Sequence, residues 1–252
     1  MRLGFHIFFG KRSMGYFLTI LDLQLNEEFW LEGEEAKHLL GSRRIRLGER
    51  IEIQDQNIRR FSCEVLETER HRLRLSPKEQ TVVPKEPSLK LWLHQGMIKE
   101  KALDWVLQKS VELGAAGVNL FVSDYSQPLP KGKDLDKKLQ RWHRIMVEAA
   151  KQSGRALVPE LKLSEENALH QIYGGPSFVF DPYLPPVPLK SLAPMDLESH
   201  LILGPEGGFS REELKSFQGK ALSLGPRVLR AETAALAALA LFGGFFGDLA
   251  DP

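Results

Sequence analysis

A strand-to-helix turn in residues 201–216, LILGPEGGFSREELKS, constrains the fold of this chain more than any other segment. A short apolar strand runs into a glycine-rich turn, and a helix start follows at once. Ser210 and Glu213 form a Ser-x-x-Glu capping box, which satisfies backbone donors at the helix start. Because open α/β sheets bind their ligands at such turns, the segment predicts a ligand site in an α/β fold.

The residues of this turn restrict the ligand. The turn reads Gly204-Pro205-Glu206-Gly207-Gly208, which is neither the Gly-x-Gly-x-x-Gly of a dinucleotide site nor a P-loop. A carboxylate at Glu206 would repel a phosphate that approaches the helix N-terminus. We therefore expect a ligand that is neutral or cationic at this point. Taken by itself, the segment also fits an ordinary tight turn.

From residue 89 onward, strands alternate with helices. The strands are expected at 89–95, 118–122, 177–180, 200–203 and, more weakly, 221–224, and the helices at 98–111, 135–151 and 232–246. This alternation predicts a parallel sheet with right-handed crossovers. The last helix is apolar on nearly all sides, so it is either a buried central helix or one that packs against a second subunit, and we favour the subunit interface.

The N-terminal part has a different pattern. Between residues 16 and 76 the segments YFLTILDL, RIEIQD, RFSCEVLE and HRLRLS show partial period-two alternation, with one short helical piece at 33–40. This pattern predicts a small β-barrel. Residues 77–88 are polar and contain prolines, which is typical of a linker to a second domain at 89–250. Residues 1–15 form an N-terminal extension that fits no pattern.

Charge and cysteine content exclude several classes of protein. The formal net charge is +1, but the first 80 residues hold eleven of the seventeen arginines and only three of the seventeen lysines. Arginine suits phosphates and base edges, so this bias favours a nucleic-acid-facing N-terminal part. A lone cysteine, Cys63, excludes a disulfide framework within the chain and a cysteine-based zinc site. We expect a cytoplasmic protein without a membrane segment, because the longest apolar run is shorter than the ~20 residues that a spanning helix needs.

Histidines and tryptophans give no sign of chemistry. His94, His143 and His170 lack metal-ligand spacing, so no metal is expected. Trp92, Trp105 and Trp142 are spaced as core residues of a strand and two helices, so we assign them a packing role.

Three clusters follow the expected carboxyl ends of strands, where an open sheet places its site. They are Phe180-Asp181-Pro182, the turn at 204–208, and the segment LGPRVLRAET at 224–233. In the third cluster Arg230 and Glu232 lead straight into the apolar helix. Charges in such a place are costly unless they are paired or functional, so a structural ion pair is the alternative to a functional role.

GPEGGFSREEL followed by LGPRVLRAETAAL resembles the C-terminal signature of the RsmE family, the 16S ribosomal RNA uracil-N3 methyltransferases of the SPOUT superfamily. KSVELG at 109–114, EAAKQSGR at 148–155 and Val158-Pro159 also resemble family motifs and occur in the family's order. In the N-terminal part, His38-Leu39-Leu40 and the stretch RRIRLGE at 43–49 resemble the family's barrel segment. The resemblance therefore covers most of the chain.

The resemblance implies a fold that periodicity does not predict. Family members have a SPOUT-type α/β domain with a C-terminal trefoil knot and a PUA-like N-terminal β-barrel that binds RNA. They are homodimers with the knot helix at the interface, and they use S-adenosylmethionine. This cofactor carries a sulfonium cation and no phosphate, which agrees with a glutamate in the turn.

Site residues follow from the same resemblance. The cofactor-binding residues are expected to be Phe180, Asp181, Leu203, Gly204, Pro205, Glu206, Gly207, Gly208, Leu224, Gly225, Pro226, Val228 and Leu229. Arg230 and Glu232 are the catalytic candidates, because the N3 proton of uracil must leave before or during methyl transfer. The RNA-binding candidates are Arg43, Arg44, Arg46, Lys99, Lys101 and Arg155. A salt-bridged, solvated face is the alternative for the three N-terminal arginines.

The chain also departs from the family pattern. Asp124-Tyr125 stand where members often carry Glu-Arg, and Ala156 stands where Asn or Thr is more usual. The resemblance implies methylation of N3 of one uridine in the decoding region of 16S ribosomal RNA in the 30S subunit. The alternatives are a SPOUT methyltransferase with another target, such as a ribose 2′-hydroxyl, and a non-catalytic assembly factor that binds ribosomal RNA.

Overall fold

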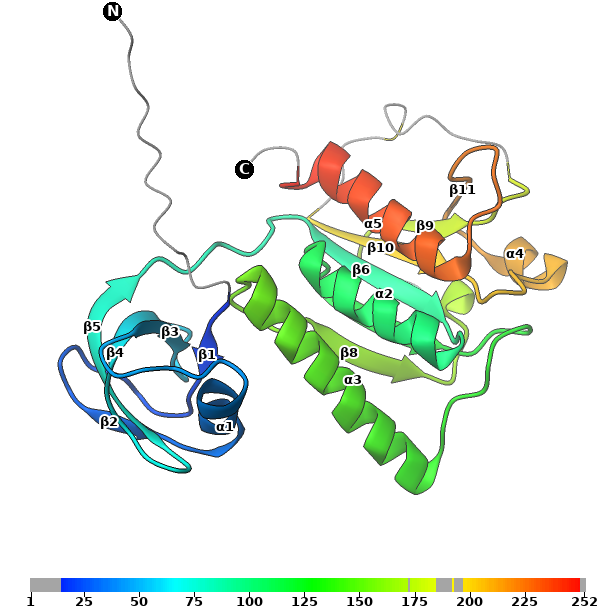
Figure 1. Cartoon of the computed structure of the whole chain (residues 1–252). Helices are drawn as coiled ribbons and strands as arrows, with labels where there is room; N and C mark the ends of the chain where they lie inside the picture. The colour runs from blue at the N-terminus through cyan, green and yellow to red at the C-terminus, as the bar shows by residue number, and fades with distance from the viewer. Residues whose placement is uncertain (1–14, 172, 185–191, 193–196, 250–252) are drawn as a thin grey trace, which may run out of the picture. The chain divides into compact units, whose positions relative to one another are not determined.

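A computed structural model describes residues 15–171, 173–184, 192 and 197–249. The chain divides into two compact units (Figure 1). The first comprises the residues up to Lys85 together with Lys151–Ala156, and the second comprises Glu86–Ala150 and the residues from Leu157 onward. The expected N-terminal extension, 1–15, lies outside the described residues except for Gly15.

The first unit is a curled, barrel-like sheet of five strands in the order β1-β3-β4-β5-β2. Its elements are β1 (Phe17–Leu18), β2 (Phe29–Leu31), α1 (Gly33–Gly41), β3 (Arg50–Gln54), β4 (Arg60–Thr68) and β5 (Leu73–Thr81). β1 pairs with β3 in parallel and the other pairs are antiparallel. Alternate side chains such as Ile51, Ile53 and Phe61 point into a core that α1 closes with Leu39.

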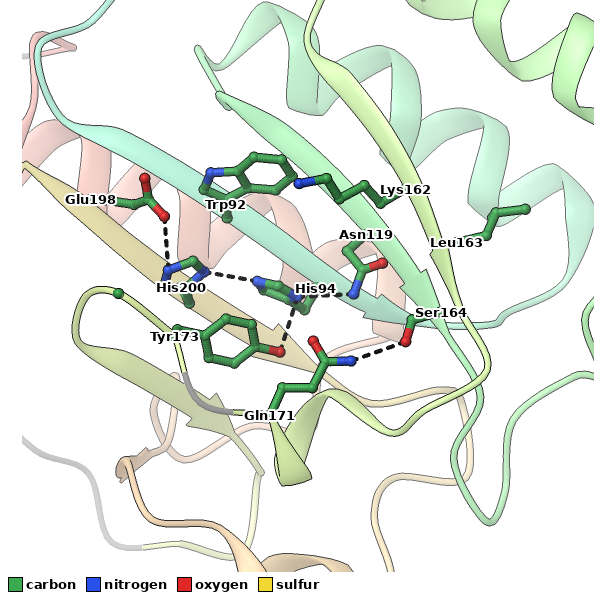
Figure 2. Close-up of a pocket in the computed structure, with 11 residues that line it drawn as sticks. Trp92, His94, Asn119, Lys162, Leu163, Ser164, Gln171, Tyr173, Glu198 and His200 are labelled. Atoms are coloured by element: carbon green, nitrogen blue, oxygen red, sulfur yellow. Dashed lines mark hydrogen bonds and ion pairs between the residues drawn. The ribbon is translucent and has the colours of Figure 1, made fainter.

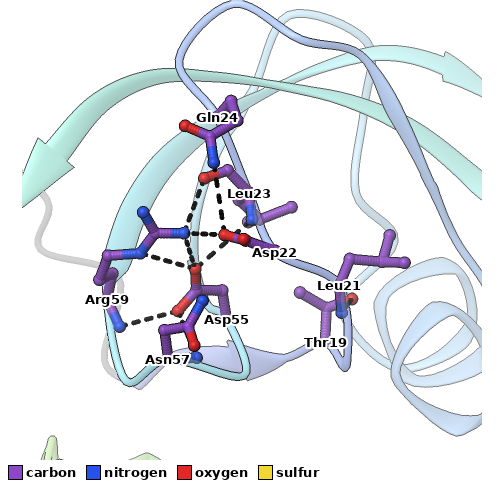
Figure 3. A network of polar contacts seen from close by, with 8 residues as sticks. All are labelled: Thr19, Leu21, Asp22, Leu23, Gln24, Asp55, Asn57 and Arg59. Carbon is purple, nitrogen blue, oxygen red and sulfur yellow. Dashed lines mark hydrogen bonds and ion pairs between the residues drawn. The ribbon is translucent and has the colours of Figure 1, made fainter.

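The turn between β3 and β4 is held by one buried carboxylate, Asp55 (Figure 3). Its oxygens accept hydrogen bonds from the backbone N–H groups of Asn57 and Arg59, at 2.9 and 2.8 Å, and from the Arg59 guanidinium at 2.6 Å. Burial alone raises the pKa of Asp55, but the hydrogen bonds and charge of Arg59 outweigh it and hold that pKa below its ordinary value. Asp22 also pairs with Arg59, so the network fixes the segment after β1.

The limits of the first unit differ from the sequence-based expectation in two places. β5 runs to Thr81, so residues 77–81 are strand rather than linker. Lys151–Ala156, at and beyond the end of the long helix α3 (Gly132–Ser153), also belong to this unit. The Tyr16 hydroxyl donates to the carbonyl of Arg155 at 2.7 Å, and the Gln54 amide donates to that of Ala156 at 3.0 Å. These contacts are between residues distant in sequence, which local patterns cannot reveal.

The second unit is an α/β domain with a wholly parallel six-stranded sheet, which confirms the expected fold class. The strand order is β11-β9-β10-β6-β7-β8. The strands are β6 (Lys90–Gly96), β7 (Gly117–Phe121), β8 (Glu160–Ser164), β9 (Ser177–Phe180), β10 (Glu198–Leu203) and β11 (Lys220–Leu222). β8 was absent from the expected strands because it is a short edge strand with polar residues at alternate positions.

Helices cover one face of this sheet (Figure 1). The helices α2 (Glu100–Glu112), α3 and α5 (Ala231–Phe246) share one core with the sheet, through residues such as Val106, Trp142 and Phe242. The other face carries a smaller cluster that includes Phe121, Ile202 and Phe209, near the short 3-10 helix η1 (Ala168–His170) and α4 (Arg211–Ser216). Trp105 was expected in the core, but it is 50% exposed beneath the Lys109 ammonium group.

Candidate functional site

Three neighbouring strands of the second unit end at the same level. In the sheet, Phe180 of β9 pairs with Leu203 of β10 on one side and with Leu222 of β11 on the other. Because all three strands are parallel, the segments that follow them leave the same edge of the sheet. The three clusters expected at strand ends are therefore brought together, as the sequence predicted.

The turn after β10 is packed so closely that it needs glycines. A Cβ atom at Gly207 would lie 2.8 Å from the Cβ of Tyr125, and one at Gly96 would lie 2.9 Å from the ring of Pro205. Both distances are shorter than real Cβ contacts, so any other residue would push the turn away from β6 or from the segment after β7. The turn is thus held by shape against its two neighbours.

Hydrogen bonds fasten the same turn. The buried side chain of Gln95, at the end of β6, donates to the carbonyl of Gly204 at 3.0 Å. The carboxylate of Glu206 accepts from the backbone N–H of Lys99 at 3.0 Å, at the start of α2. A carboxylate stabilises a helix N-terminus by satisfying an unpaired N–H group. Glu206 therefore holds the turn against α2 in this structure.

Glu213 links three loops at this edge of the sheet. The capping box with Ser210 is present as predicted, and the Glu213 carboxylate accepts from the Ser210 backbone N–H at 2.7 Å. It also accepts from the backbone N–H of Asp124 at 3.0 Å and from the side-chain amide of Asn167 at 2.5 Å. Glu213 is only 4% exposed, so these bonds are shielded from water. The carboxylate that caps α4 therefore also joins the loops after β7, β8 and β10 by hydrogen bonds.

Asp181, the first residue after β9, is a buried carboxylate without a cation partner among the described residues. Its side chain is 7% exposed, its backbone N–H donates to the carbonyl of Leu222, and one carboxylate oxygen accepts from the N–H of Tyr183. The other oxygen lies 4.0 Å from the Cβ position of Gly208. Buried carboxylates are normally paired. The residue is therefore suited to a cation or to hydroxyl donors at the junction of two loops.

The third loop leads from β11 into α5. Leu224 and Leu229 are half-buried, whereas Pro226 is exposed and Val228 is 70% exposed. Arg230 is the N-cap residue of α5 and is exposed, and Glu232 lies half-buried in its first turn. No ion pair joins the two in the described part of the chain, so the alternative of a buried structural pair does not fit this arrangement.

The RNA-binding candidates fall into two groups. Arg43, Arg44 and Arg46 are exposed on the first unit after α1, and Arg43 lies 5.7 Å above the ring of Phe17. Arg155 also belongs to the first unit, where its carbonyl is fixed by Tyr16.

Lys99 and Lys101 are exposed at the start of α2, beside the turn that Glu206 fastens. They therefore lie at the same edge of the sheet as the three loops.

Within the described residues, no group of three or more His, Cys, Asp or Glu side chains could hold a metal ion, and no helix is long and apolar enough to cross a membrane.

Sequence reasoning missed several residues that build this site. Gln95 and Asn167 are ordinary polar residues whose partners are more than 40 positions away in the chain. Tyr125 is a departure from the family pattern in the sequence, and in the structure it contacts Gly207 and is 57% exposed. One feature of the sequence could have indicated a place in the site: Gln95 ends a predicted strand, and Tyr125 follows soon after another.

Comparisons with known proteins agree with this geometry. Residues 84–243 match the family model of the RNA methyltransferase domain. Ribosomal RNA small subunit methyltransferase E from Bacillus subtilis is 28% identical, over 89% of this chain and 93% of the relative. The one from Mesomycoplasma hyopneumoniae is 32% identical, over 60% of this chain and 68% of the relative.

Solved structures extend the likeness to the fold. The crystal structure of ribosomal RNA small subunit methyltransferase E from Neisseria gonorrhoeae bound to S-adenosyl methionine has a TM-score of 0.82 at 27% identity, covering 94% of this chain and 99% of that one. A methyltransferase from Legionella pneumophila in complex with the same cofactor also has a TM-score of 0.82, at 27% identity, covering 93% of this chain and 98% of that one. With its domain model matched and its site residues at the carboxyl ends of parallel strands, this chain belongs to the ribosomal RNA small subunit methyltransferase E family.

Proposed function

We propose that this protein transfers a methyl group from S-adenosylmethionine to N3 of one uridine in the decoding region of 16S ribosomal RNA, within the 30S subunit. One observation carries the proposal. Three parallel strands end in register, and the loops that follow them come together at Asp181, a buried carboxylate that lacks a cation partner among the described residues. Family membership supports the reaction class, and two relatives of similar fold were crystallised with this cofactor.

The three loops fit the cofactor by charge and by shape. When bound, S-adenosylmethionine supplies an electrophilic methyl group on a sulfonium cation. Phe180 and Asp181, the turn at 203–208, and Leu224, Gly225, Pro226, Val228 and Leu229 would hold it. Glycines let a ligand approach the backbone of the turn closely, and Asp181 provides the negative charge that a cationic ligand needs. A sulfonium cation would match the sequence-based expectation that the ligand is neutral or cationic at this turn.

Catalysis requires removal of the N3 proton and alignment of the nitrogen with the methyl group. Much of the rate should come from this alignment, since holding two reactants in line removes a large entropic barrier. Arg230 and Glu232 begin α5 directly after the third loop. We assign Glu232 to proton removal and Arg230 to stabilisation of the uracil anion. Single-turnover rates test this assignment: wild-type rates in both Arg230→Ala and Glu232→Ala, with cofactor bound, would contradict it.

RNA binding is assigned to the exposed cations. Arg43, Arg44 and Arg46 would contact phosphates, and no ion pair within the described structure occupies Arg44 or Arg46. Lys99 and Lys101 would contact RNA next to the cofactor loops, and Arg155 would anchor RNA or the target nucleotide. With ribosomal RNA as its substrate, the protein would work in the cytoplasm.

The protein is also proposed to be a homodimer that pairs through α5. One side of this helix packs into the core through Ala235, Leu239 and Phe242. Beside this packed side, Leu241 is 39% and Phe245 50% exposed, and because they are four residues apart on the helix they form one apolar strip. A second copy of the chain would cover this strip and place two helices of this kind side by side.

Binding of S-adenosylmethionine tests the site directly. Calorimetry should show that Asp181→Asn weakens cofactor binding by about tenfold or more, because it removes the buried negative charge, a change worth about 1.4 kcal/mol or more. Glu206→Gln is the comparison variant: it removes a charge from the same site, but glutamine keeps an oxygen for the N–H of Lys99, so cofactor binding should weaken less than in Asp181→Asn. Equal affinities for wild type and Asp181→Asn would contradict the proposed mode of binding.

A further inference from the structure

A cavity of about 490 Å³ opens on the sheet face that α2, α3 and α5 do not cover (Figure 2). None of the residues that line it belongs to the three loops after β9, β10 and β11. Its volume lies within the range of small-molecule sites. The side chains that give the cavity its chemistry are Trp92, His94, Asn119, Lys162, Tyr173, Glu198 and His200.

The floor of the cavity is polar where a buried sheet face is normally apolar. His94, Asn119 and His200 are 3%, 4% and 4% exposed and lie on the three adjacent strands β6, β7 and β10. Toward the carboxyl ends of the strands, the same face carries the apolar Ile202 and Phe121. Burying polar groups costs free energy unless they are hydrogen-bonded, so three in one place require a reason.

Hydrogen bonds fix the protons on this floor. The amide nitrogen of Asn119 can only donate, and it lies 3.2 Å from Nδ1 of His94, which must therefore accept. The proton of His94 is then on Nε2, which donates to Nδ1 of His200 at 3.0 Å. Nε2–H of His200 is left facing the carboxylate of Glu198 at 3.2 Å. The chain of bonds runs in one direction and needs no charge on either imidazole.

The surrounding groups keep the floor neutral. Burial lowers the pKa of His94 to about 3, with help from the positive charges that His200 and Lys162 can carry. Burial also lowers the pKa of His200, although Glu198 opposes this. Two atoms of this floor are buried without a hydrogen-bond partner, the side-chain oxygen of Asn119 and Nε2 of His200, although the latter lies 3.2 Å from the Glu198 carboxylate. The floor thus offers a ligand a fixed, uncharged acceptor at Asn119.

Aromatic rings form the walls. The ring of Tyr173 stacks on His200 with centroids 4.2 Å apart, and its hydroxyl donates to the carbonyl of Ala168 at 2.9 Å. Trp92 lies on the other side of the imidazoles, with the ammonium group of Lys162 4.3 Å from its ring centre (Figure 2). At the rim, Lys162 pairs with the carboxylate of Glu160 at 3.3 Å, and Glu198 adds a second negative charge. These charges disfavour a bare anion, and the aromatic walls favour a flat, neutral ligand with an N–H donor.

We propose that this cavity is a nucleobase-binding site, separate from the site of methyl transfer. A base would displace the Lys162 side chain from the indole face, stack on Trp92 in its place, and donate an N–H group to the oxygen of Asn119. Two sources supply this chemistry: a free nucleoside, and a nucleotide turned out of an RNA strand. Stacking of one base on an aromatic side chain strengthens binding by about 5- to 150-fold, so the walls are worth testing first.

The first arm of the test uses free nucleosides. Uridine, cytidine, adenosine and guanosine are titrated by calorimetry into the full-length protein saturated with S-adenosylmethionine. Trp92→Leu and Asn119→Leu should each weaken binding of at least one nucleoside by about tenfold or more. Trp105→Leu is the matched control, because Trp105 is also a tryptophan with a lysine over its ring but lines no described cavity. Cofactor affinity, measured in every variant, reports whether the fold and the methyl-transfer site are intact.

The second arm uses 16S ribosomal RNA. If no nucleoside binds, but Trp92→Leu and Asn119→Leu weaken RNA binding about tenfold while Trp105→Leu does not, the base comes from RNA and the proposal stands. The proposal is overturned if the two cavity variants, with unchanged cofactor affinity, bind both nucleosides and RNA as wild type does. Absence of nucleoside binding together with unchanged RNA binding overturns it equally. Since cofactor affinity is measured separately in every variant, failure here is distinguishable from failure of the proposed function.

Discussion

The hydrogen bonds through which Glu213 joins three loops lead to a specific prediction for the substitution Glu213→Gln. In the wild type, one carboxylate oxygen accepts from Asp124 and Asn167, and the other accepts from the backbone N–H of Ser210. Glutamine can keep its oxygen in the first position, but its NH₂ group then faces the N–H of Ser210, donor against donor. The variant therefore loses one specific hydrogen bond and retains the other two.

The size of the effect follows from burial. A hydrogen bond to a charged group contributes about 1.5–3 kcal/mol, and Glu213 is only 4% exposed, so water does not replace the missing partner. For a chain of this size that loss should lower the melting temperature by at least about 3 °C. Hydrogen exchange should locate it, because the amide of Ser210 should exchange faster while that of Asp124 stays protected. Cofactor binding should weaken, since the turn loses one of its ties.

Glu212→Gln is the control, because Glu212 occupies the same first turn of α4 but is exposed. It should change neither amide and should leave the melting temperature within about 1 °C of wild type. A structural role for the carboxylate charge of Glu213 would be excluded if the Ser210 amide in Glu213→Gln remained as protected as in the wild type and the melting temperature did not move.

Three further predictions concern charge, protonation and assembly. Replacing Arg43, Arg44 and Arg46 by alanine should weaken RNA binding and lower its salt slope by about one for each phosphate that is no longer neutralised; an unchanged slope would contradict phosphate binding by these arginines. Since the pKa of His94 is lowered from 6.5 to about 3 by burial, its stabilising contribution is full above pH 6.5 and declines as the pH falls toward 3. By pH 5.5 the loss should be about 1.4 kcal/mol in urea unfolding, and an equal loss in His94→Gln would rule out this origin. Phe245→Lys should convert a dimer into monomers in sedimentation experiments, whereas a dimer that persists would exclude α5 as the interface.

The sequence predicts much of this structure because its local signals are strong. The capping box at Ser210 and Glu213 lies where the spacing indicated, and β9 matches its expected span. Short apolar strands between helical periods are enough to predict the parallel sheet. The three clusters at strand ends also meet as expected, because strands of one parallel sheet release their following loops at one edge.

Other features depend on partners that are distant in sequence. Lys151–Ala156 belong with the barrel through bonds from Tyr16 and Gln54, which no periodicity encodes. The polar floor formed by His94 and His200 arises only when β6 and β10 pair side by side, 106 positions apart in the chain. His94, whose spacing in the sequence fits no metal site, is then buried and hydrogen-bonded to His200. The trefoil knot, which the family resemblance implies, remains a prediction.

Methylation of one uridine at N3 is tested most directly by mass spectrometry of nucleosides. Isolated 30S particles and naked 16S RNA, both from a strain that lacks this protein, would be incubated with the protein and S-adenosylmethionine, digested and analysed. We expect one N3-methyluridine per 16S RNA in the particles, formed about tenfold more slowly or less when Asp181→Asn replaces the wild type at limiting cofactor. Absence of N3-methyluridine, or a 2′-O-methylated nucleoside in its place, would show that the proposed reaction is wrong.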